Sequence, residues 1–253
     1  MDPVDRLAAI YGGERLALDE VLLLVAAARP RARVDVAGGL GMLDRLAETC
    51  REPTLDGLIR HLFRDAGFRG DTGDYHDVRN SLLDQVLGRR LGMPITLGVV
   101  LLEVGRRIGV PADGVGLPGH FLVRDRVLPG VFVDPFTSGE LLDADGARRR
   151  FHAVYGPAAV FDPAWLDPVP PTAIVSRVLN NLALTFRRRA PQELDWLLDL
   201  RLSIPESPSE RRGLAELCVV RGRFGDAARL LESGPDPDHP DQARARALRA
   251  RLN

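Results

Sequence analysis

The chain has 253 residues, of which 45% are hydrophobic and 27% are charged, and its formal net charge at pH 7 is −1. This length and composition exclude a disordered chain and predict a globular domain of ordinary size with a smaller appendage. Because acidic and basic residues nearly cancel and are mixed along the chain, no broad field favours nucleic acid or an anionic membrane.

The rare residue types exclude further classes of protein. All Lys and Arg positions are Arg, so no lysine can form a Schiff base. Cys50 and Cys218 lack a CxxC or CxxH partner, which excludes a disulfide framework and a zinc module. The acidic N-terminus lacks the features of a secretory signal, and the apolar run 91–102 is too short to cross about 30 Å of hydrocarbon. We therefore expect a cytoplasmic protein that does not bind membranes.

The first 70 residues predict a bundle of helices. From Pro3 to about Arg69 the apolar side chains recur at helical spacing, with breaks at Pro30 and Pro53, and Thr54 can cap the last helix. The next segment, GFRGDTGDYHDVRNS at 67–81, is rich in Gly, Asp and Asn and predicts a loop. Its three spaced aspartates suggest calcium, but the EF-hand spacing and the closing Glu are absent. Asn80 is a typical N-cap for a helix over 82–90.

A helix over Pro94–Ile108 is the central predicted element. Proline suits a first helical turn, and the first nine residues are almost all apolar, which predicts a buried helix. Gly98 and Gly105 are seven positions apart and share a face, where a strand can approach closely.

A β-hairpin is predicted after the turn at residues 109–111. With its turn centred near Val127, Val123 pairs with Val131 and His120 pairs with Asp134, so the imidazole and the carboxylate meet on one face. GVGLPGH at 114–120 has the GxGxxG spacing, but Pro118 and the strand that follows exclude a dinucleotide loop.

The rest of the chain predicts a change from sheet to helices. Arg148 to Arg150 indicate a solvated basic end, and the Pro-rich passage 161–172 indicates a linker. Amphipathic helices are predicted at 174–189, 192–202, 210–222, 225–233 and 241–252. The piece ELCVVRGRFGDAARLLES at 216–233 has the residue pattern of a tetratricopeptide helix pair.

Residues 67–124, followed by VFVDPFTSGELL at 131–142, resemble the SirB-type bacterial branch of the transglutaminase-like superfamily. The motifs that carry the resemblance are NS, RRLGMPI, GHFLVR and DPF, and the likeness covers about residues 20–235. It implies an α+β fold: a papain-like, transglutaminase-like core in which a buried helix packs on an antiparallel sheet, with N-terminal helices and an all-α tail. The predicted division is a helical region at 1–70, the core at 71–160, the linker at 161–172 and a tetratricopeptide-like region at 173–253.

The wider superfamily uses a Cys-His-Asp triad for acyl transfer. Carried over by this resemblance, the histidine falls on His120 and the aspartate on Asp134. The nucleophile position falls on Pro94, Ile95 or Thr96, and none of these is cysteine.

Two chemical alternatives to the cysteine follow. Thr96 would lie in the first helical turn, where the helix dipole contributes only about 0.3–1 kcal/mol, too little to ionise a hydroxyl. A His–Asp pair can nevertheless act as a general base towards Thr96 or water. Cys50 would fill the gap only by reaching in from the N-terminal helices.

The sequence therefore favours a transglutaminase-like pseudoenzyme that binds a peptide or protein partner. Its predicted cleft is lined by Tyr75, Asn80, Thr96, His120 and Asp134. The alternatives are an acyl-transfer enzyme that uses His120 and Asp134 with Thr96 or water, and an adaptor that acts through its tetratricopeptide-like tail. No cofactor is predicted, and no metal site, because a site at His120 and Asp134 with His76 or His152 lacks supporting ligand spacing.

Overall fold

The contacts within the molecule divide it into two units, Met1–Thr185 and Phe186–Asn253. The computed structural model describes residues 2–11, 16–205, 207–232 and 240–251. The predicted α+β class is confirmed: helices surround a small antiparallel sheet in the first unit, and the second unit is helical in its described residues. Among the described residues, no helix is both long and apolar enough to cross a membrane.

The N-terminal helices form as their apolar spacing predicts. They are α1 (Pro3–Tyr11), α2 (Leu18–Ala27), α3 (Val36–Thr49) and α4 (Leu55–Ile59), which continues into a π-helical turn, Arg60–Asp65. Asp35 and Thr54 cap α3 and α4 by accepting the backbone N–H groups of Gly38 and Gly57. The predicted cap at Thr54 is thus confirmed.

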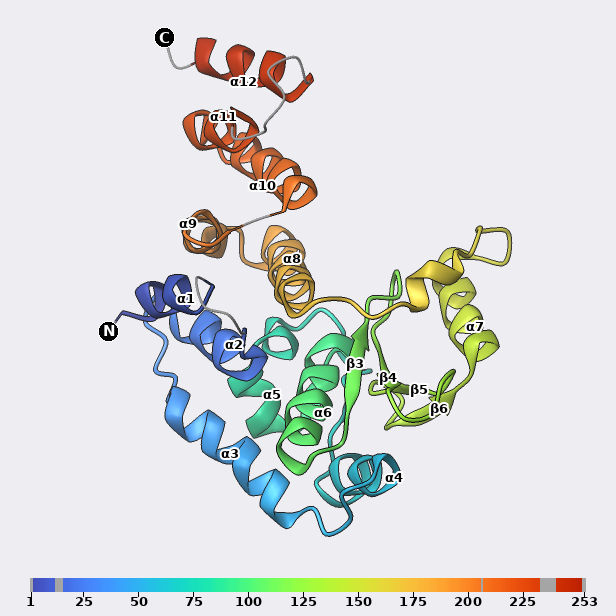
Figure 1. Cartoon of the computed structure of the whole chain (residues 1–253). Coiled ribbons are helices and arrows are strands. Elements are labelled where there is room, and N and C mark those ends of the chain that lie inside the picture. Colours follow the sequence, from blue (N-terminus) through green and yellow to red (C-terminus); the bar gives the residue numbers. More distant parts are fainter. Residues whose placement is uncertain (1, 12–15, 206, 233–239, 252–253) are drawn as a thin grey trace. The chain divides into compact units, whose positions relative to one another are not determined.

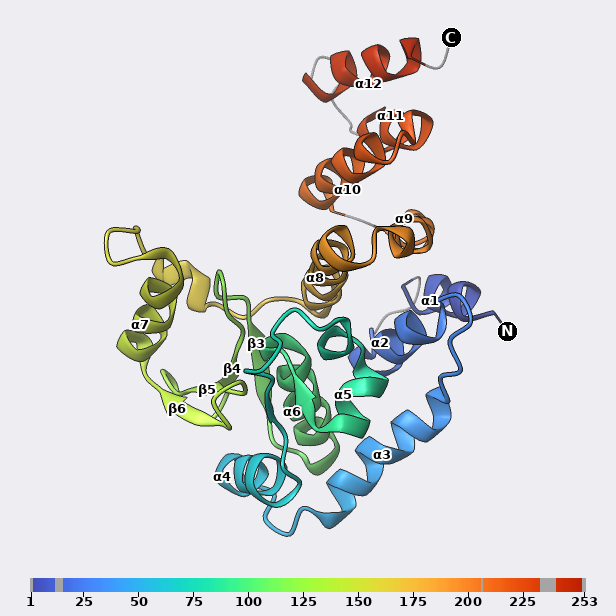
Figure 2. The same ribbon diagram turned by 180° about the vertical axis from the view of Figure 1, so that it is seen from behind.

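Helix α6 (Pro94–Ile108) has the predicted bounds and lies at the centre of the first unit. It begins with Pro94 and ends at Gly109, whose φ of 78° suits a residue without a side chain. Figure 1 shows α6 between the sheet on one side and α3 and α5 (Leu83–Arg89) on the other, and Figure 2 shows the same order from behind. Every residue from Pro94 to Leu101 is buried.

Gly98 allows the close approach that its position predicts. A Cβ atom at Gly98 would lie 2.6 Å from the ring of Phe121, which precedes β4, and 3.6 Å from Val123 within it. On the same helix, Gly105 is covered by Leu58 of α4 and by the backbone of Val110 instead. The small residues of α6 therefore admit the sheet at one end and a helix at the other.

The sheet has four antiparallel strands in the order β3-β4-β5-β6. Its strands are β3 (Ala112–Val115), β4 (Leu122–Asp125), β5 (Phe132–Asp134) and β6 (Glu140–Leu142), and α7 (Ala144–Tyr155) follows. A short parallel pair, β1 (Arg69–Gly70) with β2 (Leu91–Gly92), joins the loop after α4 to the start of α6.

The predicted hairpin exists, but its register was wrong by two residues. Val123 lies opposite Val133 rather than Val131, and His120 lies before β4 rather than within it. The connection spans residues 126–131, and Asp125 begins it by accepting the N–H of Val127 at 2.7 Å. This side-chain turn places the bend later in the chain than the apolar pattern indicates.

The Pro-rich passage 161–172 packs against the sheet instead of forming a free spacer. Phe161 and Trp165 lie against Phe151 of α7, with ring centroids 5.6 and 5.0 Å away. The N–H of Val169 donates to the carbonyl of Gly114 in β3 at 2.9 Å. Helix α8 (Pro171–Arg189) follows, and its residues up to Thr185 belong to the first unit.

The second unit contains the end of α8 and the helices of the tail. These are α9 (Leu194–Leu202), α10 (Pro208–Val220), α11 (Phe224–Glu232) and α12 (Pro240–Ala250). Helix α11 packs against both α10 and α12, around a core that includes Leu214, Cys218 and Leu231. The predicted all-α tail is confirmed, whereas its tetratricopeptide character and the four-part division of the chain stay predictions.

Candidate functional site

A tight turn before β4 presents His120. The N–H of His120 donates to the carbonyl of Leu117 at 3.0 Å, and Pro118 and Gly119 occupy the corner. Gly119 has a φ of 72°, and a Cβ atom there would lie 2.8 Å from Val154 of α7. Glycine therefore meets both the backbone and the space requirement of this turn.

The predicted contact between His120 and Asp134 is confirmed despite the different strand register. Nε2 of His120 lies 2.9 Å from Oδ1 of Asp134, although the ring N–H is not aligned with that oxygen. The pair is thus at ion-pair distance without a linear hydrogen bond. Nδ1, the other ring nitrogen, forms no hydrogen bond to any residue that the structure describes, and the imidazole remains 12% exposed.

Asp134 is fully buried and held by neighbours that stabilise its charge. Oδ1 accepts the N–H groups of Phe136 and Thr137, and Oδ2 accepts from Nε of Arg150 at 2.9 Å. Burial alone raises the pKa of Asp134, but His120, Arg150 and the Thr137 N–H outweigh it and lower the pKa below its usual value. Asp134 is therefore an anion that can orient the imidazole and stabilise its protonated form.

His120 opens onto a cavity of about 250 Å³. The walls come from the start of α6, the turn at Gly119, α7 and α8, all within the first unit. The lining residues are Tyr75, Met93, Pro94, Ile95, Gly119, His120, Phe121, Tyr155, Arg177, Asn181 and Leu184.

Arg177 of α8 clamps the turn that carries His120. Its Nη2 donates to the carbonyls of Leu117 at 2.9 Å and His120 at 2.6 Å. Burial lowers the pKa of Arg177, while the two cavity tyrosines, Tyr75 and Tyr155, act in the opposite direction. Arg177 is half-buried and lines the same cavity as His120.

The comparison with known proteins assigns this arrangement to a family, since the profile described as transglutaminase-like superfamily matches residues 18–180. The chain belongs to the transglutaminase-like superfamily. A UPF0162 protein of Xylella fastidiosa (strain Temecula1) is 41% identical over 196 residues, which is 73% of this chain and 69% of the relative. A UPF0162 protein of Vibrio cholerae is 32% identical over 162 residues, or 62% of this chain and 59% of the relative.

A shorter likeness extends to animals. Human F-box only protein 21 is 39% identical over 70 residues, which cover 28% of this transglutaminase-like chain and 11% of that protein. No solved structure matches the chain.

Thr96, one of the three positions on which the sequence resemblance places the nucleophile, has a fully buried hydroxyl that binds backbone groups. Oγ1 donates to the carbonyl of Asn80 at 2.7 Å and accepts the N–H of Met93 at 3.2 Å. Thr96 does not line the His120 cavity. These contacts connect the first turn of α6 to the loop before α5, which is a structural task for the hydroxyl.

Asn80 and Tyr75, the predicted binding residues, have different surroundings in this transglutaminase-like protein. Tyr75 lines the cavity, whereas Asn80 is fully buried and outside it. The Asn80 amide donates to the carbonyl of Asp74 at 2.9 Å and accepts from Arg89 at 3.0 Å. Asn80 is also not the N-cap of α5, which is Leu82. It holds the loop that carries Tyr75.

Neither cysteine lines the cavity of this transglutaminase-like protein. Burial raises the pKa of Cys50, whose Sγ donates to the Glu52 carbonyl. Burial raises the pKa of Cys218 to about 11, and this thiol lies in the core of the second unit. Neither thiol is therefore activated as a thiolate nucleophile.

Metal-ligand clusters are absent from the ranges that the structure describes, since no three His, Cys, Asp or Glu side chains gather there. Nδ1 of His152 forms a hydrogen bond with the carbonyl of Gly156 at the end of α7, at 3.0 Å. In the loop at 67–81, carboxylate oxygens of Asp71 and Asp77 lie 3.2 and 3.8 Å from Nη2 of Arg89. The positive charge next to these two aspartates is thus the guanidinium of Arg89.

Sequence reasoning missed Arg150 and Arg177. Arg150 was predicted to be solvated, but it bridges Asp134 and Glu140. Arg177 fell within the amphipathic helix predicted at 174–189, with no role assigned to it, and the structure places it in the first unit, bonded to the His120 carbonyl. The available signal was an arginine within an apolar helical stripe, IVSRVLNNLAL at 174–184.

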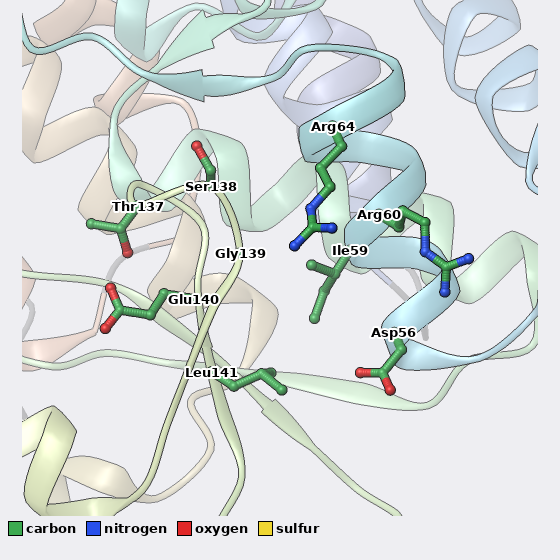
Figure 3. Close-up of a pocket in the computed structure, with 9 residues that line it drawn as sticks. All are labelled: Asp56, Ile59, Arg60, Arg64, Thr137, Ser138, Gly139, Glu140 and Leu141. Carbon is green, nitrogen blue, oxygen red and sulfur yellow. The ribbon is translucent and has the colours of Figure 1, made fainter.

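A second, larger cavity of about 610 Å³ lies between the π-helical turn after α4 and the bend before β6. Figure 3 shows Arg60 and Arg64 on one wall and the segment from Thr137 to Leu141 on the other. Arg60 is already paired with Glu52, and Glu140 with Arg150. Two of the four charged residues in its lining are therefore already paired with residues outside the cavity.

Proposed function

We propose that this transglutaminase-like protein binds a peptide or protein segment at the His120 cavity and holds it without acyl transfer. The observation that carries the proposal is the apolar rim of the cavity. Tyr75, Tyr155 and Leu184 are 38%, 53% and 52% exposed, and all three line the one cavity. Exposed aromatic and aliphatic groups around a polar centre are typical of surfaces that bind another chain.

The absence of an activated nucleophile supports binding over turnover. Acyl transfer through a covalent intermediate needs a thiolate or a hydroxyl beside the base. The Thr96 hydroxyl is bonded to backbone groups, and neither cysteine lines the cavity. The two tyrosines that line it carry weakly acidic phenols, and burial raises the pKa of Tyr75 further.

The test is a selection for binding followed by a search for turnover. Peptides selected from a random display library on the full-length protein should bind the wild type and lose at least tenfold in affinity with His120→Ala or Tyr155→Ala. His61→Ala is the matched control, because His61 is a partly exposed histidine outside the cavity. Mass spectrometry of the bound peptides should show no cleavage and no acyl adduct on the protein. Cleavage or an adduct that depends on His120 would refute the proposal.

The second candidate is an amidohydrolase or acyl transferase in which His120 activates water or Thr96. It is favoured by one observation: Nε2 of His120 faces the ionised Asp134, while Nδ1 has no partner among the described residues. That is the arrangement of a general base. It predicts a bell-shaped pH dependence of amide or thioester hydrolysis that disappears in His120→Ala. Activity that survives in both His120→Ala and Thr96→Ala would exclude it.

The SirB-type assignment and an adaptor role for the tail stay predictions. Val220 at the end of α10 is 68% exposed, so this apolar side chain of the tail is accessible to a partner. If the tail is the docking element, Val220→Arg should abolish binding of a partner while His120→Ala leaves it intact. The reverse result supports binding at the cavity.

A further inference from the structure

We infer that the His120 cavity receives a peptide C-terminus whose last residue is apolar, with the terminal carboxylate bound by Arg177. This inference rests on the proposed function, since it names the kind of peptide that the same cavity takes. The observation behind it is a half-buried cation without an acidic partner. No carboxylate lies within ion-pair distance of Arg177 among the residues that the structure describes.

A buried cation is costly unless an anion or hydrogen-bond acceptors compensate it. Arg177 has two acceptors, the carbonyls of Leu117 and His120, and both bind the same Nη2 atom. A guanidinium has five N–H donors, so the donors on its other nitrogen atoms stay available. A carboxylate compensates the charge by accepting from Nε or Nη1, because both bidentate edges of the guanidinium include Nη2.

The other polar features of the cavity fit an anion as well. The first turn of α6, at Pro94 and Ile95, forms part of the wall, and the helix dipole favours negative charge there. Asp134, the nearby carboxylate, is already paired with His120 and Arg150 and lies outside the lining. The cavity wall therefore contains a cation, an imidazole and a helix N-terminus, and no acidic residue.

The remaining lining selects the kind of carboxylate. Ile95, Phe121 and Leu184 are apolar members of the same lining as Arg177, and of the three Leu184 is exposed. A C-terminal residue carries its side chain and its carboxylate on one carbon atom, so both reach these walls together. The volume of about 250 Å³ is below the roughly 300–1,000 Å³ of pockets for drug-sized ligands, and suits one terminal residue.

N-Acetyl-leucine is the probe, because it contains only the terminal carboxylate, an apolar side chain and one amide. The imidazole resonances of His120, assigned with His120→Ala, are followed by NMR on the full-length protein during titration. We expect a saturable shift with N-acetyl-leucine and at least tenfold weaker binding of N-acetyl-leucinamide, which lacks the charge. Arg177→Met should weaken binding of the acid to the level of the amide. Arg187→Met, an exposed arginine on the same helix, should leave it unchanged.

Two further probes distinguish the source of the anion. N-Acetylglutamic acid α-amide carries its carboxylate on a side chain, and inorganic phosphate is an anion without an apolar part. If either binds as tightly as N-acetyl-leucine, recognition of a C-terminus is wrong.

The inference is also overturned if the acid and the amide bind the wild type equally, or if millimolar N-acetyl-leucine causes no shift. The comparison of acid with amide uses only the wild type, so it holds even if Arg177→Met disturbs the turn. Equal binding of acid and amide leaves peptide binding without turnover intact, whereas turnover of selected peptides refutes the proposed function and leaves the carboxylate preference standing.

Discussion

The charge of Asp134 should be visible in the pH dependence of stability. Its pKa is lowered in the folded state, so the unfolded chain takes up the proton first as the pH falls. The stabilisation is fully present above the unfolded-state value and is lost as the pH falls through the folded-state pKa. Between about pH 5 and pH 3 we expect the free energy of unfolding to decrease more in the wild type than in Asp134→Asn.

Urea unfolding across that range measures this difference. Near neutral pH, Asp134→Asn should cost about 1.5–3 kcal/mol, the usual value for hydrogen bonds to a charged group. Asp145→Asn is the control, because Asp145 is an exposed aspartate of α7. A wild type and an Asp134→Asn variant with parallel pH profiles would show that folding does not lower the pKa of Asp134.

Substitutions of Thr96 test whether its hydroxyl stabilises the fold. Thr96→Val keeps the shape but removes the donor to Asn80 and the acceptor for Met93, so we expect a loss of about 1–3 kcal/mol in stability. Thr96→Ser should recover most of it, and Thr72→Val, at an exposed position, should cost almost nothing. Thermal unfolding gives the comparison. Unchanged stability in Thr96→Val would mean that the hydroxyl has no structural task.

Helix α6 depends on a glycine where the sheet meets it. Gly98→Ala would place a methyl group 2.6 Å from the Phe121 ring, so the ring must move. We expect a net loss of about 1–2 kcal/mol, because overpacking outweighs the gain in helix propensity. Gly98→Ala should also weaken the affinity for the selected peptides, since Phe121 lines the cavity.

The matched control for this change is Gly88→Ala in α5. A Cβ atom at Gly88 meets nothing within 4 Å, so the alanine should stabilise the protein by up to about 1 kcal/mol. Opposite signs for the two variants in chemical denaturation are the expected result. A stabilising Gly98→Ala would contradict the close packing of α6 on the sheet.

The division into two units predicts separable local stability. Leu231 lies in the core of the second unit, and Leu231→Ala should cost about 2–5 kcal/mol there. Hydrogen exchange followed by mass spectrometry should show faster exchange in the described residues after Phe186, with the first unit protected as before. Leu101→Ala, in the buried face of α6, should have the opposite distribution. Faster exchange throughout the chain in both variants would mean that the units unfold together.

The helices and the His–Asp pair were readable from the chain because their signals are local. Proline at the start of α6, glycine after its end and an apolar run between them specify backbone conformation within a few residues. The apolar spacing likewise predicted the helical tail and the two strands of the hairpin, with its turn near Val127. His120 and Asp134 were paired on the correct hairpin, although its connection was misjudged, because a turn formed by Asp125 has only a weak sequence signal.

The hydrogen-bond partners of Arg177 and Thr96 follow from contacts between distant segments, which local sequence patterns do not encode. The donor and acceptors of the Arg177 clamp are 57 and 60 residues apart in the chain, and the hydroxyl of Thr96 meets a carbonyl 16 residues earlier. The burial of a hydroxyl and its hydrogen-bond partners depend on the segments packed around it. The sequence around Thr96 is therefore compatible with either a nucleophile or a structural hydrogen bond. Sequence pattern and family resemblance thus indicated the helix and the hairpin that carry the candidate site residues. Tertiary packing showed that Thr96 is bonded to the backbone and that an arginine from α8 completes the cavity, because only packing brings those groups together.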